Sequence, residues 1–163
     1  MYKSFCPSLV SNLHAHEMMK TDLITLSPET NVFAAVDTLI KNQISGAPVV
    51  DGDHRLLGVF SEKSVMKVLV EAAYEQVPMD RVDALMNKEP RTISENTLLV
   101  TMAQIFLTSP ARRLPVLRDG VLVGQVSRRD VIRAATKEQP RHTPEAQLLY
   151  LSALRSMAEA PNV

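Results

Sequence analysis

Apolar side chains recur along two stretches of the chain with the spacing of a helix face. In each stretch they fall at positions i, i+3, i+4, i+7 and i+8, so that one side of the helix is apolar and the other side is polar. The first set is Val32, Ala35, Val36, Leu39 and Ile40, and the second set is Leu99, Met102, Ala103, Phe106 and Leu107. We expect two helices that each bury these five side chains.

The other apolar runs are short and alternate with polar, glycine-containing turns, which is typical of β-hairpins. A Ser/Thr/Asn-rich segment stands before each predicted helix and can cap its first N–H groups with a side chain. The predicted strands are 23–26, 47–50, 56–60, 91–93, 114–117 and 121–126, the capping segments are 27–31 and 94–97, and the closing helices are 62–74 and 128–136. The pattern runs strand, helix, hairpin and helix, and then it repeats.

The two halves of the chain also repeat in sequence. Thr25-Leu-Ser-Pro-Glu-Thr returns 67 residues later as Thr92-Ile-Ser-Glu-Asn-Thr. From Gly58, which matches Gly124, the offset is 66. The lost residue falls in the polar turn of the hairpin, where a change of length costs little free energy. A repeat that keeps its register within the elements and slips in a turn indicates a duplicated fold.

One unit of about 60 residues buries too little surface to be stable alone, so we expect the two units to pack sheet to sheet. The predicted fold class is α/β, with two units about a pseudo-twofold axis, small three-stranded sheets inside and helices outside. The predicted divisions are an N-terminal tail (1–16), unit 1 (17–74), a linker (75–83), unit 2 (84–136) and a C-terminal linker and helix (137–163). The helix expected at 143–157 packs either on the module or on a partner chain.

Composition and charge act only by exclusion. Lys plus Arg and Asp plus Glu both total 18, so no global field favours nucleic acid or an acidic membrane surface. The one cysteine, Cys6, excludes a disulfide within the chain and indicates a reducing compartment. No apolar run suits a membrane span and no signal peptide is recognised, so we expect a cytoplasmic protein. The four histidines lack metal-ligand spacing, and no metal is expected.

Residues with binding chemistry gather where the last strand of unit 2 runs into its closing helix. The free N–H groups and the dipole of a helix N-terminus favour an anion such as phosphate. Arg128 and Arg129 add cationic donors there, and Asp130 can accept hydrogen bonds from both hydroxyls of a ribose. Ser127 and Asp130 also have the spacing of a capping box, which satisfies the helix itself. Both roles stay open, and one residue can serve both.

The order of strand, helix, Pro-Val strand, Gly-h-h-Ser strand (where h is an apolar residue) and helix resembles a cystathionine-β-synthase (CBS) domain pair, also called a Bateman module. The resemblance covers residues 86–133 and, more loosely, 19–68. In that family the Gly-h-h-Ser/Thr-x-x-Asp segment binds adenosyl ligands such as AMP, ADP, ATP or S-adenosylmethionine. The resemblance therefore implies a regulatory ligand, no required cofactor, and association into a homodimer through the helices.

The resemblance places the main site in unit 2. It implies that Ser127, Arg128 and Asp130 hold the ribose and phosphate. It places the base between the first strand and the Pro-containing strand, at Thr92, Ile93, Leu114, Pro115 and Val116. Arg112 and Arg113 precede that strand, and they form either a polyphosphate site or a solvated surface patch.

Unit 1 departs from this pattern. It has Ser64 where unit 2 has Asp130, and Glu62 where unit 2 has Arg128. A carboxylate beside a phosphate is unfavourable. We therefore expect a second cleft that is weaker, empty or altered in specificity, at Thr25, Leu26, Ala47, Pro48, Ser61 and Ser64.

These observations leave three candidate functions for the chain. The first is a stand-alone regulatory module that binds an adenosyl ligand, mainly in unit 2, and signals to an unknown effector protein. The second is a structural dimerisation module without a physiological ligand. The third, an enzyme, is not expected, because the sequence has no visible nucleophile–base pair, P-loop, dinucleotide-binding fingerprint or nucleophile elbow.

Overall fold

The structure is a computed structural model, and it describes residues 12–72 and 81–137. The tail that carries Cys6, most of the predicted linker and the predicted helix at 143–157 lie outside the described residues. Within the two described ranges, no helix is long and apolar enough to cross a membrane.

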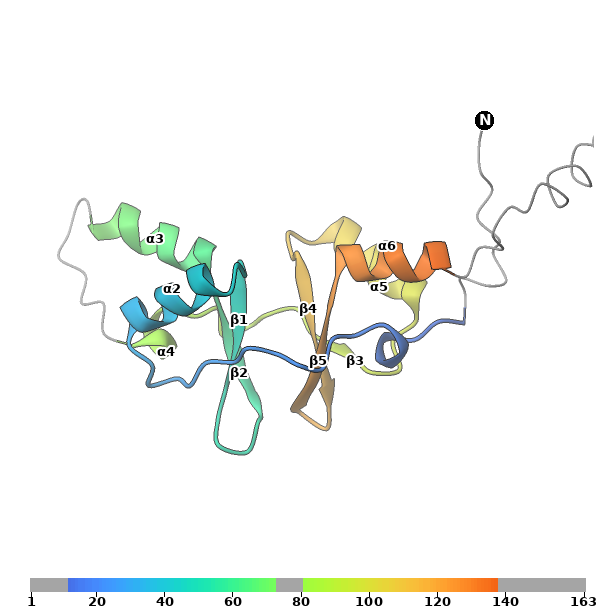
Figure 1. Cartoon of the computed structure of the whole chain (residues 1–163), viewed down its shortest axis with the longest axis horizontal. Helices are drawn as coiled ribbons and strands as arrows, with labels where there is room; N and C mark the ends of the chain where they lie inside the picture. The colour runs from blue at the N-terminus through green and yellow to red at the C-terminus, as the bar shows by residue number, and fades with distance from the viewer. Residues whose placement is uncertain (1–11, 73–80, 138–163) are drawn as a thin grey trace, which may run out of the picture.

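Two small sheets stand side by side at the centre of the molecule, and helices cover their outer sides (Figure 1). The first unit holds α2 (Val32–Lys41), β1 (Gly46–Val50), β2 (Leu56–Ser61) and α3 (Glu62–Ala72). The second unit holds β3 (Ile93–Ser94), α5 (Leu99–Thr108), β4 (Arg113–Arg118), β5 (Val121–Ser127) and α6 (Arg128–Lys137). A short helix precedes each unit along the chain: η1 (Ala15–Glu17) comes before the first unit, and α4 (Val82–Leu85) comes before the second. The predicted α/β tandem architecture is confirmed.

Both predicted hairpins form, and they have equivalent registers. In β1 and β2, Pro48 lies opposite Val59. In β4 and β5, Pro115 lies opposite Gln125. Since successive side chains of a strand point to opposite faces, these pairs point away from the core side chains of their own unit. The turns of the two hairpins also meet, because Leu122 N–H donates to the His54 carbonyl at 3.0 Å.

The first predicted strand, 23–26, is wrong as a strand. Of this segment only Leu26 pairs with the sheet, in an isolated parallel bridge to Val49. Its N–H donates to Pro48 O at 2.9 Å, and its carbonyl accepts from Val50 N–H at 3.0 Å. The residues before Leu26 cross toward the other unit, so they cannot extend the ladder. The described sheet of unit 1 therefore has two strands, whereas that of unit 2 has three in the order β3-β4-β5.

The predicted helix caps are confirmed in one unit and wrong in the other. The Asn31 side chain accepts a hydrogen bond from Phe33 N–H at 2.9 Å and so caps α2. Helix α5 begins after Leu98 without a side-chain cap from the segment 94–97. Instead, Leu99 N–H donates to the backbone carbonyl of Leu13 at 2.7 Å. A carbonyl from a distant part of the chain has taken the place of the expected side chain.

The predicted buried faces of α2 and α5 are correct except at their last positions. Ile40 is 70% exposed and Leu107 is 85% exposed. The eighth position after the start of such a pattern lies at the edge of the apolar stripe, where a neighbouring element must cover it. The two exposed residues are equivalent in the repeat, so both units present the same uncovered flank.

Two segments, here called straps, cross between the units (Figure 1). The first strap, residues 12–20, precedes unit 1, yet its Ala15 is fully buried in the core of unit 2. The second strap, residues 82–87, precedes unit 2, yet its Val82 is fully buried in the core of unit 1. The predicted unit boundaries at residues 17 and 84 fall inside these straps, and the division into domains stays a prediction.

Each strap ends with a pair of backbone hydrogen bonds to a central strand. Lys20 exchanges both backbone hydrogen bonds with Gln125 of β5, each at 2.9 Å. Asn87 does the same with Val59 of β2, again at 2.9 Å. The straps therefore fix the two sheets relative to each other at equivalent places.

Candidate functional site

A cleft of about 1140 Å³ opens between the two units. Both units line it: the first contributes parts of α2, β1 and β2 and the start of α3, and the second contributes the segment before β4 and one face of its sheet. The end of the second strap and the residues after it, 87 and 89–91, also take part. The volume is slightly above the roughly 300–1,000 Å³ usual for small-molecule sites.

The charges around the cleft favour an anionic ligand. Four cationic side chains line it, and two carboxylates accompany them. The cations are Lys63, Arg91, Arg112 and Arg113, and the carboxylates are Glu62 and Glu89. Arginine offers several donors in a fixed plane, which suits phosphate oxygens. The arginines thus come from unit 2 and its approach, while Glu62 and Lys63 come from the α3 start of unit 1.

Ser61 stands at the junction of β2 and α3, where it lines the cleft. Its hydroxyl accepts a hydrogen bond from Ser64 N–H at 3.4 Å and lies 3.3 Å from the Ser64 hydroxyl. The next backbone N–H, of Glu62, donates to the carbonyl of Ser45 at 3.1 Å. The helix start is therefore partly satisfied by the protein, and the side chains of Ser61 and the charged residues remain to meet a ligand.

In unit 2 the equivalent junction is closed by Ser127 and Asp130. One carboxylate oxygen of Asp130 accepts hydrogen bonds from Ser127 N–H at 2.9 Å and from the Ser127 hydroxyl at 2.5 Å. Asp130 is 8% exposed, and neither residue lines the cleft. The geometry is that of the capping box considered from the sequence. A ribose contact for the same pair stays a prediction.

Arg128 is engaged with the end of α5. Its guanidinium donates to the carbonyl of Phe106 at 3.1 Å and to that of Ser109 at 3.3 Å. It also lies 5.8 Å from the centre of the Phe106 ring, within the range of a cation–π contact. The last carbonyls of a helix have no partner inside the helix, so Arg128 supplies one. Its predicted contact with phosphate stays untested beside this structural role.

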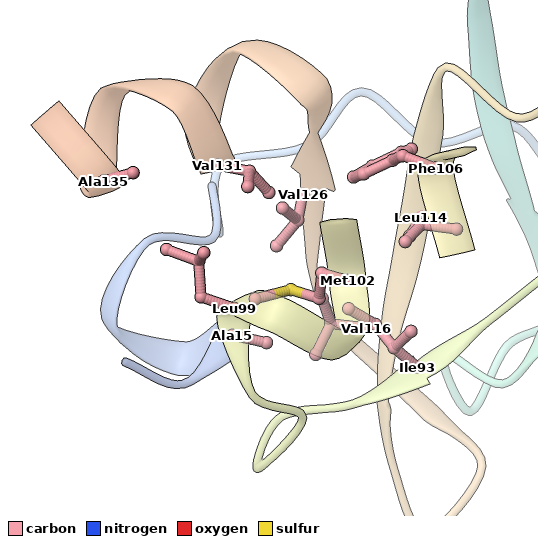
Figure 2. Packing of buried hydrophobic residues seen from close by; sticks show 10 residues of the cluster. All are labelled: Ala15, Ile93, Leu99, Met102, Phe106, Leu114, Val116, Val126, Val131 and Ala135. Carbon is pink, nitrogen blue, oxygen red and sulfur yellow. The ribbon is translucent and has the colours of Figure 1, made fainter. Parts of the chain in front are cut away.

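Most residues predicted to surround the base lie in the core of unit 2. Ile93, Leu114 and Val116 point into one apolar cluster together with Ala15 of the first strap (Figure 2). Pro115, between two of them, points the other way and lines the cleft. Thr92 is half-buried, outside the lining. Of the residues predicted for the main site, those that line the cleft are Arg112, Arg113 and Pro115.

The residues predicted for the weaker cleft of unit 1 divide in the same way. Leu26 and Ala47 belong to the core of unit 1, and Pro48 is buried. Thr25 and Ser64 are half-buried and do not line the cleft. Ser61 does line it, beside the arginines of unit 2. One residue predicted for the weaker cleft and three residues predicted for the main site therefore line the same cleft.

Sequence reasoning missed several polar residues that line the cleft, among them Asn87, Arg91 and Gln125. Asn87 ends the second strap, and Arg91 follows it. Gln125 stands inside the Gly-h-h-Ser segment of unit 2, at a position where the family pattern has an apolar residue. That departure was a readable signal in the sequence, whereas the position of the strap was not.

Outside the cleft, Arg118 and Glu95 form an ion pair through two hydrogen bonds. Arg118 Nε lies 2.7 Å from Glu95 Oε1, and its Nη2 lies 2.5 Å from Oε2. These hydrogen bonds hold the pKa of the Glu95 carboxyl below its usual value. Among residues 12–72 and 81–137, no group of three His, Cys, Asp or Glu side chains is arranged to hold a metal ion.

The fold and the cleft together define a two-unit module with a ligand-sized space between its units. The family model described as the CBS domain matches residues 15–71 and 82–137, and the chain therefore belongs to the CBS-domain family. The family resemblance seen in the sequence is confirmed.

Relatives of the chain include both proteins named for CBS domains and larger enzymes. The CBS domain-containing protein CBSX1, chloroplastic, of Arabidopsis thaliana is 31% identical over 142 residues, which cover 71% of this chain and 60% of that protein. The A-adding tRNA nucleotidyltransferase of Aquifex aeolicus is 24% identical over 138 residues, which cover 85% of this chain and 16% of that enzyme. The chain thus spans at most 60% of the length of these two relatives.

Among solved structures, the crystal structure of CBSX2 in complex with AMP is similar to this chain. Its TM-score is 0.69 and its sequence is 29% identical, with 76% of this chain and 96% of that chain covered. The similarity confirms the tandem α/β arrangement. In that crystal structure, AMP is bound to CBSX2.

Proposed function

We propose that the chain is a regulatory module that senses an adenosyl ligand in the cleft between its two CBS units. The observation that carries the proposal is the lining of that cleft, where Arg112 and Arg113 of unit 2 meet Ser61 at the α3 start of unit 1. The AMP complex of CBSX2 supports the choice of ligand class. The candidates are AMP, ADP, ATP and S-adenosylmethionine, as regulatory ligands and not as required cofactors.

In this proposal unit 2 supplies most of the binding free energy, because it brings the two arginines. A hydrogen bond to a charged group contributes roughly 1.5–3 kcal/mol, against about 1 kcal/mol for a neutral one. Glu62 of unit 1 opposes a phosphate placed beside it. The ligand therefore depends on both units, with its anionic end held mainly by the second.

A ligand that touches both units gives the module a way to signal. It binds best to one arrangement of the units and so shifts the population toward that arrangement. A partner protein that contacts the module then meets a different surface. We propose binding without turnover, in the cytoplasm, with the partner protein as the effector.

Thermal unfolding with each candidate ligand tests the proposal. Ligand at a hundred times its Kd stabilises the folded state by about 2.7 kcal/mol, which raises Tm by roughly 5–10 °C in a chain of this size. The variant Arg113→Gln should lose most of that shift. The matched control is Arg129→Gln, because Arg129 is an exposed arginine outside the cleft. No shift with any of the four ligands, or an equal loss in both variants, contradicts the proposal.

A second candidate is a dimerisation module without a physiological ligand. It is favoured by exposed apolar side chains at equivalent positions of both units: Leu107 and Ile132 in the second, and Ile40 and Met66, which also line the cleft, in the first. We propose that two copies associate over these helices, with or without a ligand. Light scattering should show a dimer of the native chain and a monomer of Leu107→Lys with Ile132→Lys. A native monomer contradicts the dimer.

A further inference from the structure

We propose that Gln125 is the residue that reads the base of the ligand. The proposal rests on the proposed function, since it names the side chain that contacts one part of the adenosyl ligand. It concerns specificity within the cleft and assigns no role to Gln125 in holding phosphate.

Gln125 is an unusual residue for its place in the fold. It lies in the middle of β5 and is only 8% exposed. Its neighbour in the strand, Val126, is fully buried in the core of unit 2, so the Gln125 side chain points to the opposite face and lines the cleft. A buried amide costs free energy unless it has a hydrogen-bond partner.

The backbone of Gln125 is already satisfied, and its side chain is not. Both backbone groups pair with Lys20 of the first strap. Within the described residues, no hydrogen bond reaches the side-chain amide. No fully buried side-chain nitrogen or oxygen in that part of the chain lacks a partner, so the Gln125 amide atoms are not fully buried, and the residue lines the cleft. The amide is held by the strand and presented to whatever fills the cleft.

The duplication supplies an internal comparison. Val59 occupies the equivalent place in β2, pairs through its backbone with Asn87 of the second strap and also lines the cleft. The fold is therefore built with an apolar side chain at this position of unit 1. Packing therefore does not require an amide at the same position of unit 2. A contact with a ligand accounts for its presence there.

A glutamine amide matches the edge of an adenine base. It carries a donor and an acceptor side by side, and so does the edge formed by the 6-amino group and the adjacent ring nitrogen. Pro115, opposite Gln125 in the register, and Val59 offer apolar surface at the same cleft. The base can lie against this surface with its edge toward Gln125, while the arginines hold the phosphate.

The test combines one change in the protein with one change in the ligand. Calorimetric titration measures the Kd of AMP and of purine riboside 5′-monophosphate, which lacks the 6-amino group, for the native chain, Gln125→Leu and Val59→Ala. The native chain should bind AMP about tenfold more tightly, as about 1.4 kcal/mol of lost hydrogen bonding implies. Gln125→Leu should bind both nucleotides equally. Val59→Ala should weaken both by one common factor and keep the preference for AMP.

The outcomes separate this inference from the function on which it rests. A native chain that binds both nucleotides equally, or a Gln125→Leu variant that keeps the preference, overturns base reading and leaves adenosyl binding intact. A native chain that binds neither nucleotide nor any other adenosyl ligand overturns the proposed function, and base reading with it. GMP is not the test ligand, because the amide can turn over to match the reversed donor and acceptor of a 6-oxo purine.

Discussion

Replacing Gly58 by alanine tests whether the second strap fixes unit 1. A Cβ at Gly58 would lie 2.6 Å from the carbonyl oxygen of Asn87 and 2.8 Å from the Met86 sulfur. The sulfur belongs to a flexible side chain, but the carbonyl does not. It accepts from Val59 N–H while Asn87 N–H donates to Val59, so it can move only if both hydrogen bonds stretch. The added methyl group therefore acts on the strap backbone itself.

The size of the effect follows from that geometry. Overpacking in a well-packed region costs about 1–3 kcal/mol, and a backbone contact places Gly58→Ala at the upper end. In a chain of this length each kcal/mol lowers Tm by about 2–4 °C, so we expect a loss of roughly 5–10 °C. Since Asn87 also lines the cleft, AMP affinity should fall as well.

Thermal and urea unfolding, both followed by circular dichroism, measure the change, and two other glycines serve as references. Gly52 has no atom within 4 Å of an added Cβ, so Gly52→Ala should be neutral or slightly stabilising. At Gly124 the shortest contact, 2.5 Å, is to the flexible side chain of Met19, and the backbone carbonyl of Lys20 is at 3.0 Å. Gly124→Ala should therefore lose less than Gly58→Ala. Equal stability of the Gly58 and Gly52 variants would refute the reasoning.

Two further predictions concern the ion pair and the capping pair of unit 2. Asp130→Ala should lower the free energy of unfolding of the unliganded protein, measured in urea, by about 1–2 kcal/mol, because Ser127 loses its acceptor. Asp130→Asn should lower it by less. An unchanged free energy of unfolding in both variants would show that the capping pair contributes nothing. Glu95 has a lowered pKa in the folded state, so its contribution is present above its usual pKa of 4.5 and is lost as the pH falls through the folded value. The urea midpoint of Glu95→Gln should lie below that of the native chain at pH 7 and converge with it as the pH falls below 4.5, whereas a gap independent of pH would contradict the role of the Arg118 pair.

Much of the fold was predictable because local pattern determines it. The helix-face spacing predicted α2 and α5, and the polar turns predicted both hairpins. The cap of α5 could not be predicted, because the carbonyl that accepts from Leu99 belongs to Leu13, which is distant in sequence and leaves no local signal. The exposure of Leu107 has a similar cause, since spacing shows which residues share a stripe and not which neighbour covers its edge.

The candidate site was predictable only in part. The sequence grouped residues by unit, whereas the cleft joins Arg113 of one unit to Ser61 of the other. Alternation along the strand explains why Pro115 reaches the cleft and Val116 does not. Gln125 was visible as a departure from an apolar pattern, but its burial and its free amide required the structure.

The crossed straps have a consequence for what half of this chain would be. A polypeptide with a single unit keeps the strap that precedes it, which packs in the core of another unit. It lacks the strap that packs in its own core. Its core stays open at the place that Ala15 or Val82 fills here. It can close only by exchanging straps with a second copy, which is domain swapping. The tandem chain therefore has the architecture of a swapped homodimer whose two subunits have been joined end to end, so that joining them required a linker and no new interface.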